Sequence, residues 1–340
     1  MSSFIPVITA LVAFAVTAVM GIPFIPYLRK LKFGQTILDD GPSWHKSKQG
    51  TPTMGGIMIV AGVIAALVIG IITGFLSDAP LANELQGGLK PITLIAGLVF
   101  ALMCGAIGFI DDYIKVVKKR NLGLTAKQKT VLQLLATLAY LITLAVGGMH
   151  TTWIPFVGDV NIISGFGLIF WPISLIFIYY MVNAVNLTDG IDGLASSITL
   201  VVCCAYMLIA SRSGMAGINC LAAAGAGSCV GFIFWNAKPA KVFMGDTGSM
   251  FLGGLVVALA YGCGKPILLI LAGIVYILEA LSVVLQVASF KLTGKRIFKM
   301  SPIHHHFEMS GWSEDKICLV FSVVAFVGCF VAALAVYLGW

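Results

Sequence analysis

Charged side chains are scarce in this chain. Asp, Glu, Lys and Arg make up 10% of its 340 residues, whereas hydrophobic residues make up 59%. Soluble globular proteins devote about a quarter of their residues to charge. This shortage excludes an ordinary soluble domain and indicates that lipid is the solvent.

Several familiar signatures are also missing. The eight cysteines contain no CxxC pair and no Cys/His ligand spacing, so we interpret them as small apolar packing residues. No basic segment precedes the first hydrophobic stretch and no small-residue cleavage site follows it, which favours a retained span over a secretory signal. No nucleic-acid motif accompanies the formal charge of +7, so we expect no nucleic-acid partner.

Long apolar stretches fill much of the chain. One helix needs about 20 mainly apolar residues to cross the hydrocarbon core of a bilayer. Such stretches lie near 4–27, 55–75, 91–110, 131–149, 166–187, 193–211, 217–235, 250–263, 266–287 and 317–338. We therefore predict an all-α, polytopic membrane helical bundle with about ten transmembrane helices, built as one domain over residues 1–340.

The basic residues indicate how this bundle is oriented. All Lys and Arg residues except Lys90, Arg212 and Lys265 fall in the odd-numbered loops between the predicted spans. The positive-inside rule then puts those loops in the cytoplasm and both termini on the extracytoplasmic side. Most acidic residues and four of the five histidines lie in the same loops, so we expect the chemistry on the cytoplasmic face.

Two adjacent carboxylates, Asp111 and Asp112, end the third stretch, and a basic run that begins at Lys115 follows them. At the lipid boundary this pair costs desolvation and mutual repulsion, which a divalent cation or nearby lysines would relieve. The alternative is an ordinary polar cap that closes a span. The pair alone does not decide between the two.

The loop after the fifth stretch contains no Lys or Arg, yet Asn186, Asp189 and Asp192 recur in it every three residues. This spacing can place their oxygens on one side of a turn, where Gly190 and Gly193 would let the backbone approach a ligand. An ordinary turn would need only one Asn or Asp beside a Gly. We therefore favour a functional loop.

The run from Gly245 to Ser249 offers the carboxylate of Asp246, two hydroxyls and pliant backbone at the start of a helix. These groups suit a metal bound beside a phosphate. The alternative is that Asp246 or Thr247 only caps the helix. Three acidic loops on the same face favour a functional site.

Three consecutive histidines, His304, His305 and His306, follow a basic cluster in the last odd-numbered loop. Neighbouring side chains of an extended chain point to opposite faces, so we do not expect all three to bind one ion. We interpret them as hydrogen-bond donors or phosphate contacts. Glu279, inside the ninth stretch, is costly in lipid, and we expect it to be hydrogen-bonded within the bundle.

The segment before the second stretch carries Lys46, Lys48 and Thr53 beside paired glycines. These groups can form an anion cradle, although a basic flank of a span explains the lysines equally well. Acidic loops and cations at a membrane boundary suit phosphoryl transfer between a soluble donor and a lipid phosphate. A transporter would usually place its charges near the midplane, where this sequence offers only Glu279.

Five motifs carry a family resemblance. They are Gly-Thr-Pro-Thr-Met-Gly-Gly at 50–56, Asp-Asp-Tyr at 111–113, Asn-Leu-Thr-Asp-Gly-Ile-Asp-Gly at 186–193, Phe-Met-Gly-Asp-Thr-Gly-Ser at 243–249 and Pro-Ile-His-His-His-Phe-Glu at 302–308. In this order they resemble the polyprenyl-phosphate N-acetylhexosamine-1-phosphate transferases, and among these the phospho-N-acetylmuramoyl-pentapeptide transferases. The resemblance implies ten spans in a bacterial plasma membrane. It also implies Mg²⁺-dependent transfer from UDP-N-acetylmuramoyl-pentapeptide to undecaprenyl phosphate, which gives lipid I and UMP.

The resemblance further implies roles for single residues. Asp246 corresponds to a Mg²⁺ ligand, with Asp189 as a second one, and Asp111, Asp112 and His305 are expected at the reaction centre. The residues expected to touch the nucleoside, the phosphates or the metal-proximal pocket are Lys48, Thr53, Lys115, Lys119, Lys127, Asn186, Asp189, Asp192, Asn236, Phe243, Gln286, His305 and His306.

The acidities argue against an Asp acting as general base. A phosphate monoester has a second pKa of about 6, so at pH 7 it is mostly dianionic already. Moving a proton from its monoanion to an Asp of pKa about 3.9 would be uphill by about 3 kcal/mol. We hypothesise that Asp111 and Asp112 instead hold metal or order the lipid phosphate.

Two alternatives stay open. One is a sister transferase that uses UDP-N-acetylglucosamine, and the other, from a different class, is a secondary transporter. A homodimer is suggested by analogy alone.

Overall fold

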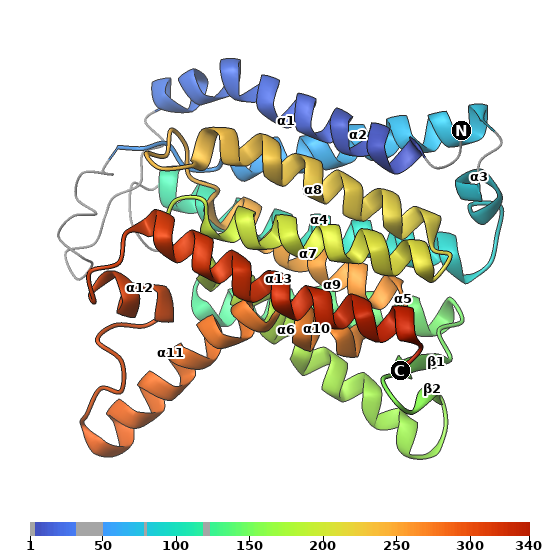
Figure 1. The fold of residues 1–340 in the computed structure, drawn as a ribbon. Coiled ribbons are helices and arrows are strands. Elements are labelled where there is room, and N and C mark those ends of the chain that lie inside the picture. The colour runs from blue at the N-terminus through green and yellow to red at the C-terminus, as the bar shows by residue number, and fades with distance from the viewer. Residues whose placement is uncertain (1–3, 32–49, 78–79, 118–122) are drawn as a thin grey trace.

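The computed structural model describes residues 4–31, 50–77, 80–117 and 123–340, which are mostly helical (Figure 1). The long helices are α1 (Ile5–Lys30), α2 (Gly56–Leu76), α4 (Leu89–Val117), α5 (Ala126–Val146), α6 (Phe170–Thr188), α7 (Leu194–Arg212), α8 (Ala216–Asn236), α9 (Gly245–Gly262), α11 (Ile274–Thr293) and α13 (Glu314–Leu338). The short elements are the helices α3 (Pro80–Glu84), α10 (Leu269–Ala272) and α12 (Ile303–Glu308), the 3₁₀ helices η3 (Gly165–Ile169) and η4 (Pro266–Leu268), and the strands β1 (Thr151–Ile154) and β2 (Gly158–Asn161).

Nine helices in the described part of the chain are long and apolar enough to cross a bilayer. The all-α prediction and the prediction of a multi-pass membrane protein are therefore supported. The nine helices correspond to nine of the ten predicted stretches. The remaining stretch, 250–263, corresponds to α9, which starts earlier than predicted, and its first turn carries Asp246. The prediction of about ten spans thus differs from the structure at α9.

The helix α9 runs through the middle of the bundle. Every residue from Thr247 to Gly262 is buried, and the helix packs against α4, α6 and α2. A Cβ on Gly254 would lie 2.7 Å from Cα of Ala101 in α4, and one on Gly253 would lie 2.9 Å from Cα of Val182 in α6. Small residues let helices approach closely where lipid removes the usual hydrophobic drive for packing. Backbone contact therefore sets the position of α9.

The two ends of the bundle carry different structures (Figure 1). The helix α1 begins and α13 ends at the same end, where the hairpin of β1 and β2 also lies, and α12 lies at the opposite end. The start of α1 and the end of α13 therefore lie at the same end of the bundle.

Local structure departs from the sequence prediction at three places. The stretch 266–287 is interrupted at Gly273, between α10 and α11. The segment between the predicted stretches 131–149 and 166–187 contains an antiparallel hairpin in which Thr151 pairs with Asn161. The third stretch does not end at Asp111, because α4 continues to Val117, where an ion pair between Asp111 and Lys115 at i,i+4 supports the helix.

The packing of α9 generates a stability prediction. We expect Gly254→Val to lower the melting temperature of the detergent-solubilised protein, because overpacking of a tight interface costs about 1–3 kcal/mol. The matched control is Ala106→Val, on the exposed side of α4. Thermal unfolding followed by size-exclusion chromatography compares the two. Equal melting temperatures for both variants would contradict the close packing of α4 on α9.

Candidate active site

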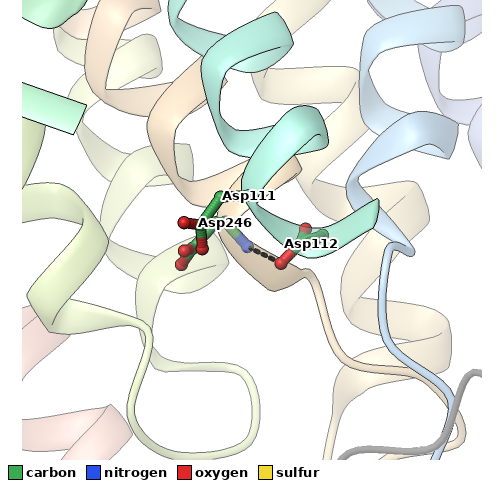
Figure 2. Close-up of side chains that lie close together, drawn as sticks. All are labelled: Asp111, Asp112 and Asp246. Atoms are coloured by element: carbon green, nitrogen blue, oxygen red, sulfur yellow. Dashed lines mark hydrogen bonds between the residues drawn. The ribbon is translucent and has the colours of Figure 1, made fainter. Parts of the chain in front are cut away.

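The first turn of α9 is held by a carboxylate of α4. The Oδ atoms of Asp112 accept a hydrogen bond from the backbone N–H of Asp246 at 3.2 Å (Figure 2). They also accept hydrogen bonds from the backbone N–H of Thr247 at 2.9 Å and from the Thr247 hydroxyl at 2.7 Å. Asp112 is 3% exposed. A helix N-terminus has unpaired N–H groups and a partial positive charge. Asp112 therefore does for α9 what an N-cap residue does within its own helix.

Asp246 projects from this turn toward two lysines and an amide. Its Oδ2 atom lies 3.0 Å from Nζ of Lys115 and 3.0 Å from Nζ of Lys129. Its Oδ1 atom accepts a hydrogen bond from Nδ2 of Asn186 at 2.9 Å. These partners come from α4, α5 and α6, so four helices meet at one carboxylate.

Asp111 completes a cluster of three carboxylates. It pairs with Nζ of Lys115 at 2.6 Å and accepts a hydrogen bond from the N–H of Leu124 at 2.8 Å. Ligand oxygens of Asp111, Asp112 and Asp246 lie within 4.8 Å of one another (Figure 2). Hard cations such as Mg²⁺ prefer oxygen ligands, and a cation relieves the repulsion among close carboxylates. This donor set therefore fits a divalent cation.

Two glycine-rich segments join beside this cluster through their backbones. The N–H of Phe243 donates to the carbonyl of Pro52 at 2.8 Å, and the N–H of Gly55 donates to the carbonyl of Phe243 at 2.9 Å. Gly245 has φ of 72°, and a Cβ there would lie 2.8 Å from Oγ1 of Thr53. The predicted contact residue Thr53 therefore lies against the first turn of α9.

Asp189 follows α6 and lies in the field of the same cluster. Burial, together with the negative charges of Asp246, Asp112 and Asp192, raises the pKa of Asp189 to about 8. A carboxyl group with this pKa is mostly protonated at pH 7. In the absence of a cation, Asp189 therefore adds little negative charge to the site.

Asp192 and Asn236 connect two loops through backbone groups. Oδ2 of Asp192 accepts a hydrogen bond from the N–H of Ala240 at 3.0 Å. Oδ1 of Asn236 accepts one from the N–H of Gly193 at 3.0 Å, and its Nδ2 donates to the carbonyl of Val242 at 3.0 Å. These two side chains fix the loop after α6 against the loop after α8.

Asn186, Asp189 and Asp192 do not lie in one turn, as their spacing had suggested. Asn186 lies within α6 and faces Asp246, whereas Asp192 faces the loop after α8. The prediction failed because α6 continues through Thr188, so the three residues do not share one backbone conformation.

The side chain of Gln286 forms hydrogen bonds with the backbone of the segment between α11 and α12. Its Oε1 accepts hydrogen bonds from the N–H of Ile297 at 3.0 Å and of Phe298 at 2.9 Å, and its Nε2 donates to the carbonyl of Phe298 at 2.9 Å. The side chain thereby fixes the segment that leads from α11 to α12.

The three histidines lie in the helix α12, so the assumption of an extended chain was wrong. Successive residues of a helix point about 100° apart. Nδ1 of His305 lies 2.6 Å from Oε2 of Glu308, and Nδ1 of His306 accepts the N–H of Lys299 at 3.1 Å. The rings therefore face different partners.

Glu279 is hydrogen-bonded, as expected. Its Oε2 atom lies 2.9 Å from Nδ1 of His304, and both side chains are fully buried. The partner belongs to α12 rather than to another membrane helix.

Known proteins resemble the chain over nearly its whole length. The model of Glycosyl transferase family 4 matches residues 94–264, and signature 1 of phospho-N-acetylmuramoyl-pentapeptide-transferase matches residues 48–60. A phospho-N-acetylmuramoyl-pentapeptide-transferase of Clostridioides difficile (strain 630) is 44% identical over 332 residues, 97% of each chain. One of Bacillus thuringiensis (strain Al Hakam) is 43% identical over 337 residues, 98% of this chain and 97% of the relative.

This chain belongs to the phospho-N-acetylmuramoyl-pentapeptide-transferase family. The described residues among those that the family resemblance singled out fall into four groups by location. Those that meet at or beside the carboxylate cluster are Thr53, Asp111, Asp112, Lys115, Asn186, Asp189, Phe243 and Asp246. Those whose side chains bind backbone groups of the loops are Asp192, Asn236 and Gln286. Those on α12 are His305 and His306. Lys127 is exposed on α5, while Lys48 and Lys119 lie outside the described residues.

Lys129 is the site residue that the family comparison by motif missed. A capping box formed by Thr125 and Gln128 marks the start of α5. Lys129 lies one turn before the buried Gln133, on the same face of this helix. Lys127 lies on a different face of that helix. A polar residue within a span, such as Gln133, was the signal that could have identified the face of α5 that points into the bundle.

The cluster generates a metal-binding prediction for this member of the transferase family. We expect the purified protein to bind Mn²⁺, a spectroscopic substitute for Mg²⁺ with similar oxygen preference. Asp246→Asn removes one carboxylate of the cluster and should weaken binding by about tenfold or more. Electron paramagnetic resonance of free Mn²⁺ measures both, with Asp315→Asn, an exposed carboxylate of α13, as the control. Equal weakening by both substitutions would indicate unspecific surface binding.

Proposed function

We propose that this chain transfers phospho-N-acetylmuramoyl-pentapeptide from UDP-N-acetylmuramoyl-pentapeptide to undecaprenyl phosphate, giving lipid I and UMP in peptidoglycan synthesis. The observation that carries the proposal is the meeting of Asp111, Asp112 and Asp246 with Lys115 and Lys129 at one end of a membrane bundle. Near-full-length identity to transferases of that name supports the same reaction.

The site has to bring two anionic phosphates together, so it must supply positive charge and fix geometry. Lys115 and Lys129 provide that charge from α4 and α5, and Asp246 holds both ammonium groups in place. Asp246, Asp111 and Asp112 would hold Mg²⁺, which would supply positive charge to neutralise the donor diphosphate. We retain Asp189 as a further proposed ligand.

The contacts of Asp112 support a structural role rather than a general base. Both of its oxygens already accept hydrogen bonds from the first turn of α9. Protonating this side chain would weaken those three bonds in every cycle. The lipid phosphate, mostly dianionic at pH 7, can attack the donor phosphate directly, with UMP as the leaving group.

The distribution of cations supports a cytoplasmic site. Lys115, Lys129 and Lys299 lie at the end of the bundle that carries the carboxylates and α12, whereas Lys90 binds the carbonyl of Gly214 at the other end. Basic residues prefer the cytoplasmic side of a membrane protein. We therefore propose that the site opens to the cytoplasm of a bacterial plasma membrane and that both termini lie outside.

The donor decides between the two transferase branches. With undecaprenyl phosphate and Mg²⁺, we expect the purified protein to release UMP from UDP-N-acetylmuramoyl-pentapeptide but not from UDP-N-acetylglucosamine. Asp246→Asn should lose nearly all of this release, and Asp315→Asn should keep it. Release from the smaller donor would assign the chain to the sister branch. A wild type that releases UMP from neither donor would favour a transporter.

The pH dependence of the rate distinguishes a structural role of Asp112, as the cap of α9, from a role as general base. We expect the rate to fall below about pH 6, because the lipid phosphate then gains a proton. In Asp112→Asn the rate should be lower at every pH, since α9 loses part of its cap, but the inflection should stay near pH 6. Initial rates of UMP release at saturating Mg²⁺ give the profiles. An inflection that disappears in Asp112→Asn would restore the general base.

A further inference from the structure

A buried acid–base pair joins α11 to α12 apart from the three-carboxylate cluster. Oε2 of Glu279 lies 2.9 Å from Nδ1 of His304, and the exposed fraction of both side chains is 0%. Glu279 is the only acidic residue within α11. A carboxylate at such a position in a membrane protein is expensive to bury, so its presence calls for a physical reason.

Stability does not supply that reason. Oε1 of Glu279 and Nε2 of His304 are buried and have no hydrogen-bond partner among the described residues. Each buried polar atom without a partner is unfavourable. Apolar residues of similar volume often replace a buried ion pair without loss of stability. The pair is therefore better suited to fixing an orientation than to strengthening the fold.

The element that the pair orients is α12. This helix has six residues, too few to hold its own conformation or direction. The ring of His304 packs on Gly190, where a Cβ would collide with Nε2 of His304. Its centroid lies 4.1 Å from that of His305. His304 thus connects a membrane helix, the acidic turn beside Asp189 and the next histidine.

We propose that Glu279 is a positioning residue: through His304 it fixes the rotation of α12 on the acidic turn, and so determines where His305 and His306 lie. The kinetic consequence of this inference rests on the proposed transferase function, with His305 and His306 contacting the nucleotide donor as the family resemblance implies. We expect binding of the lipid acceptor to depend less on the pair.

The test compares variants that differ in one property each. Glu279→Gln keeps an oxygen that can accept the Nδ1–H of His304. The double variant Glu279→Leu/His304→Leu replaces the pair by apolar side chains, and Glu279→Asp withdraws the carboxyl group by one methylene without changing its chemistry. Tyr276→Phe is the matched control, because it removes another buried hydrogen bond of α11, to Thr199 at 2.7 Å.

Two measurements apply to all variants, namely KM and kcat for each substrate, and hydrogen exchange of the segment 303–309. We expect the double variant to fold, to exchange faster in that segment and to raise KM for UDP-N-acetylmuramoyl-pentapeptide about tenfold or more, with KM for undecaprenyl phosphate within about twofold. Glu279→Gln and Tyr276→Phe should stay within about threefold of wild type.

Wild-type kinetics and exchange in the double variant would overturn the proposal, as would an equal rise of KM for both substrates. If the double variant does not fold, Glu279→Asp decides by the same criteria. A wild type that releases no UMP would refute the proposed function, and hydrogen exchange would still decide whether the pair holds α12.

Discussion

The capping of α9 by Asp112 determines the geometry of the whole site. The close contacts of Gly253 and Gly254 fix where α9 lies in the bundle, and contacts at its N-terminus hold its first turn, which carries Asp246. Asp112 binds the N–H groups of Asp246 and Thr247, and Asp111 precedes it on α4. The distance between the carboxylates of Asp111 and Asp246 is therefore set by a neighbour of both. Adjacent aspartates in one motif thus have different tasks.

Hydrophobicity predicted the membrane helices well because each helix must satisfy its own backbone in lipid. Hydrophobicity did not predict where a helix ends inside an apolar run, as at Gly273. It also did not predict the structure of the polar loops. The helix α12 depends on contacts between residues distant in sequence, such as the pair of Glu279 and His304. Composition and spacing do not contain these contacts.

Motifs identified the acidic residues of the site but not their tasks. Asp111, Asp112 and Asp246 were predicted and do meet, whereas Lys129 was missed because its part in the site depends on which face of α5 turns inward. Asp192, Asn236 and Gln286 belong to the same motifs or neighbouring segments, yet their described hydrogen bonds go to backbone groups of loops. A side chain's partner, rather than its motif, indicates what it does.

These backbone-binding side chains answer a problem that any site at a membrane boundary has. Loops there lack the apolar core that would fix them in a soluble domain, and phosphoryl transfer requires groups to be held in line. Side chains that each bind two or three backbone groups, as Gln286 and Asp112 do, can replace that core. Each of these side chains forms hydrogen bonds with a loop or helix end from another part of the chain. The rigidity of the site therefore depends on all of these hydrogen bonds together. The loss of one such side chain should therefore move several ligand contacts together.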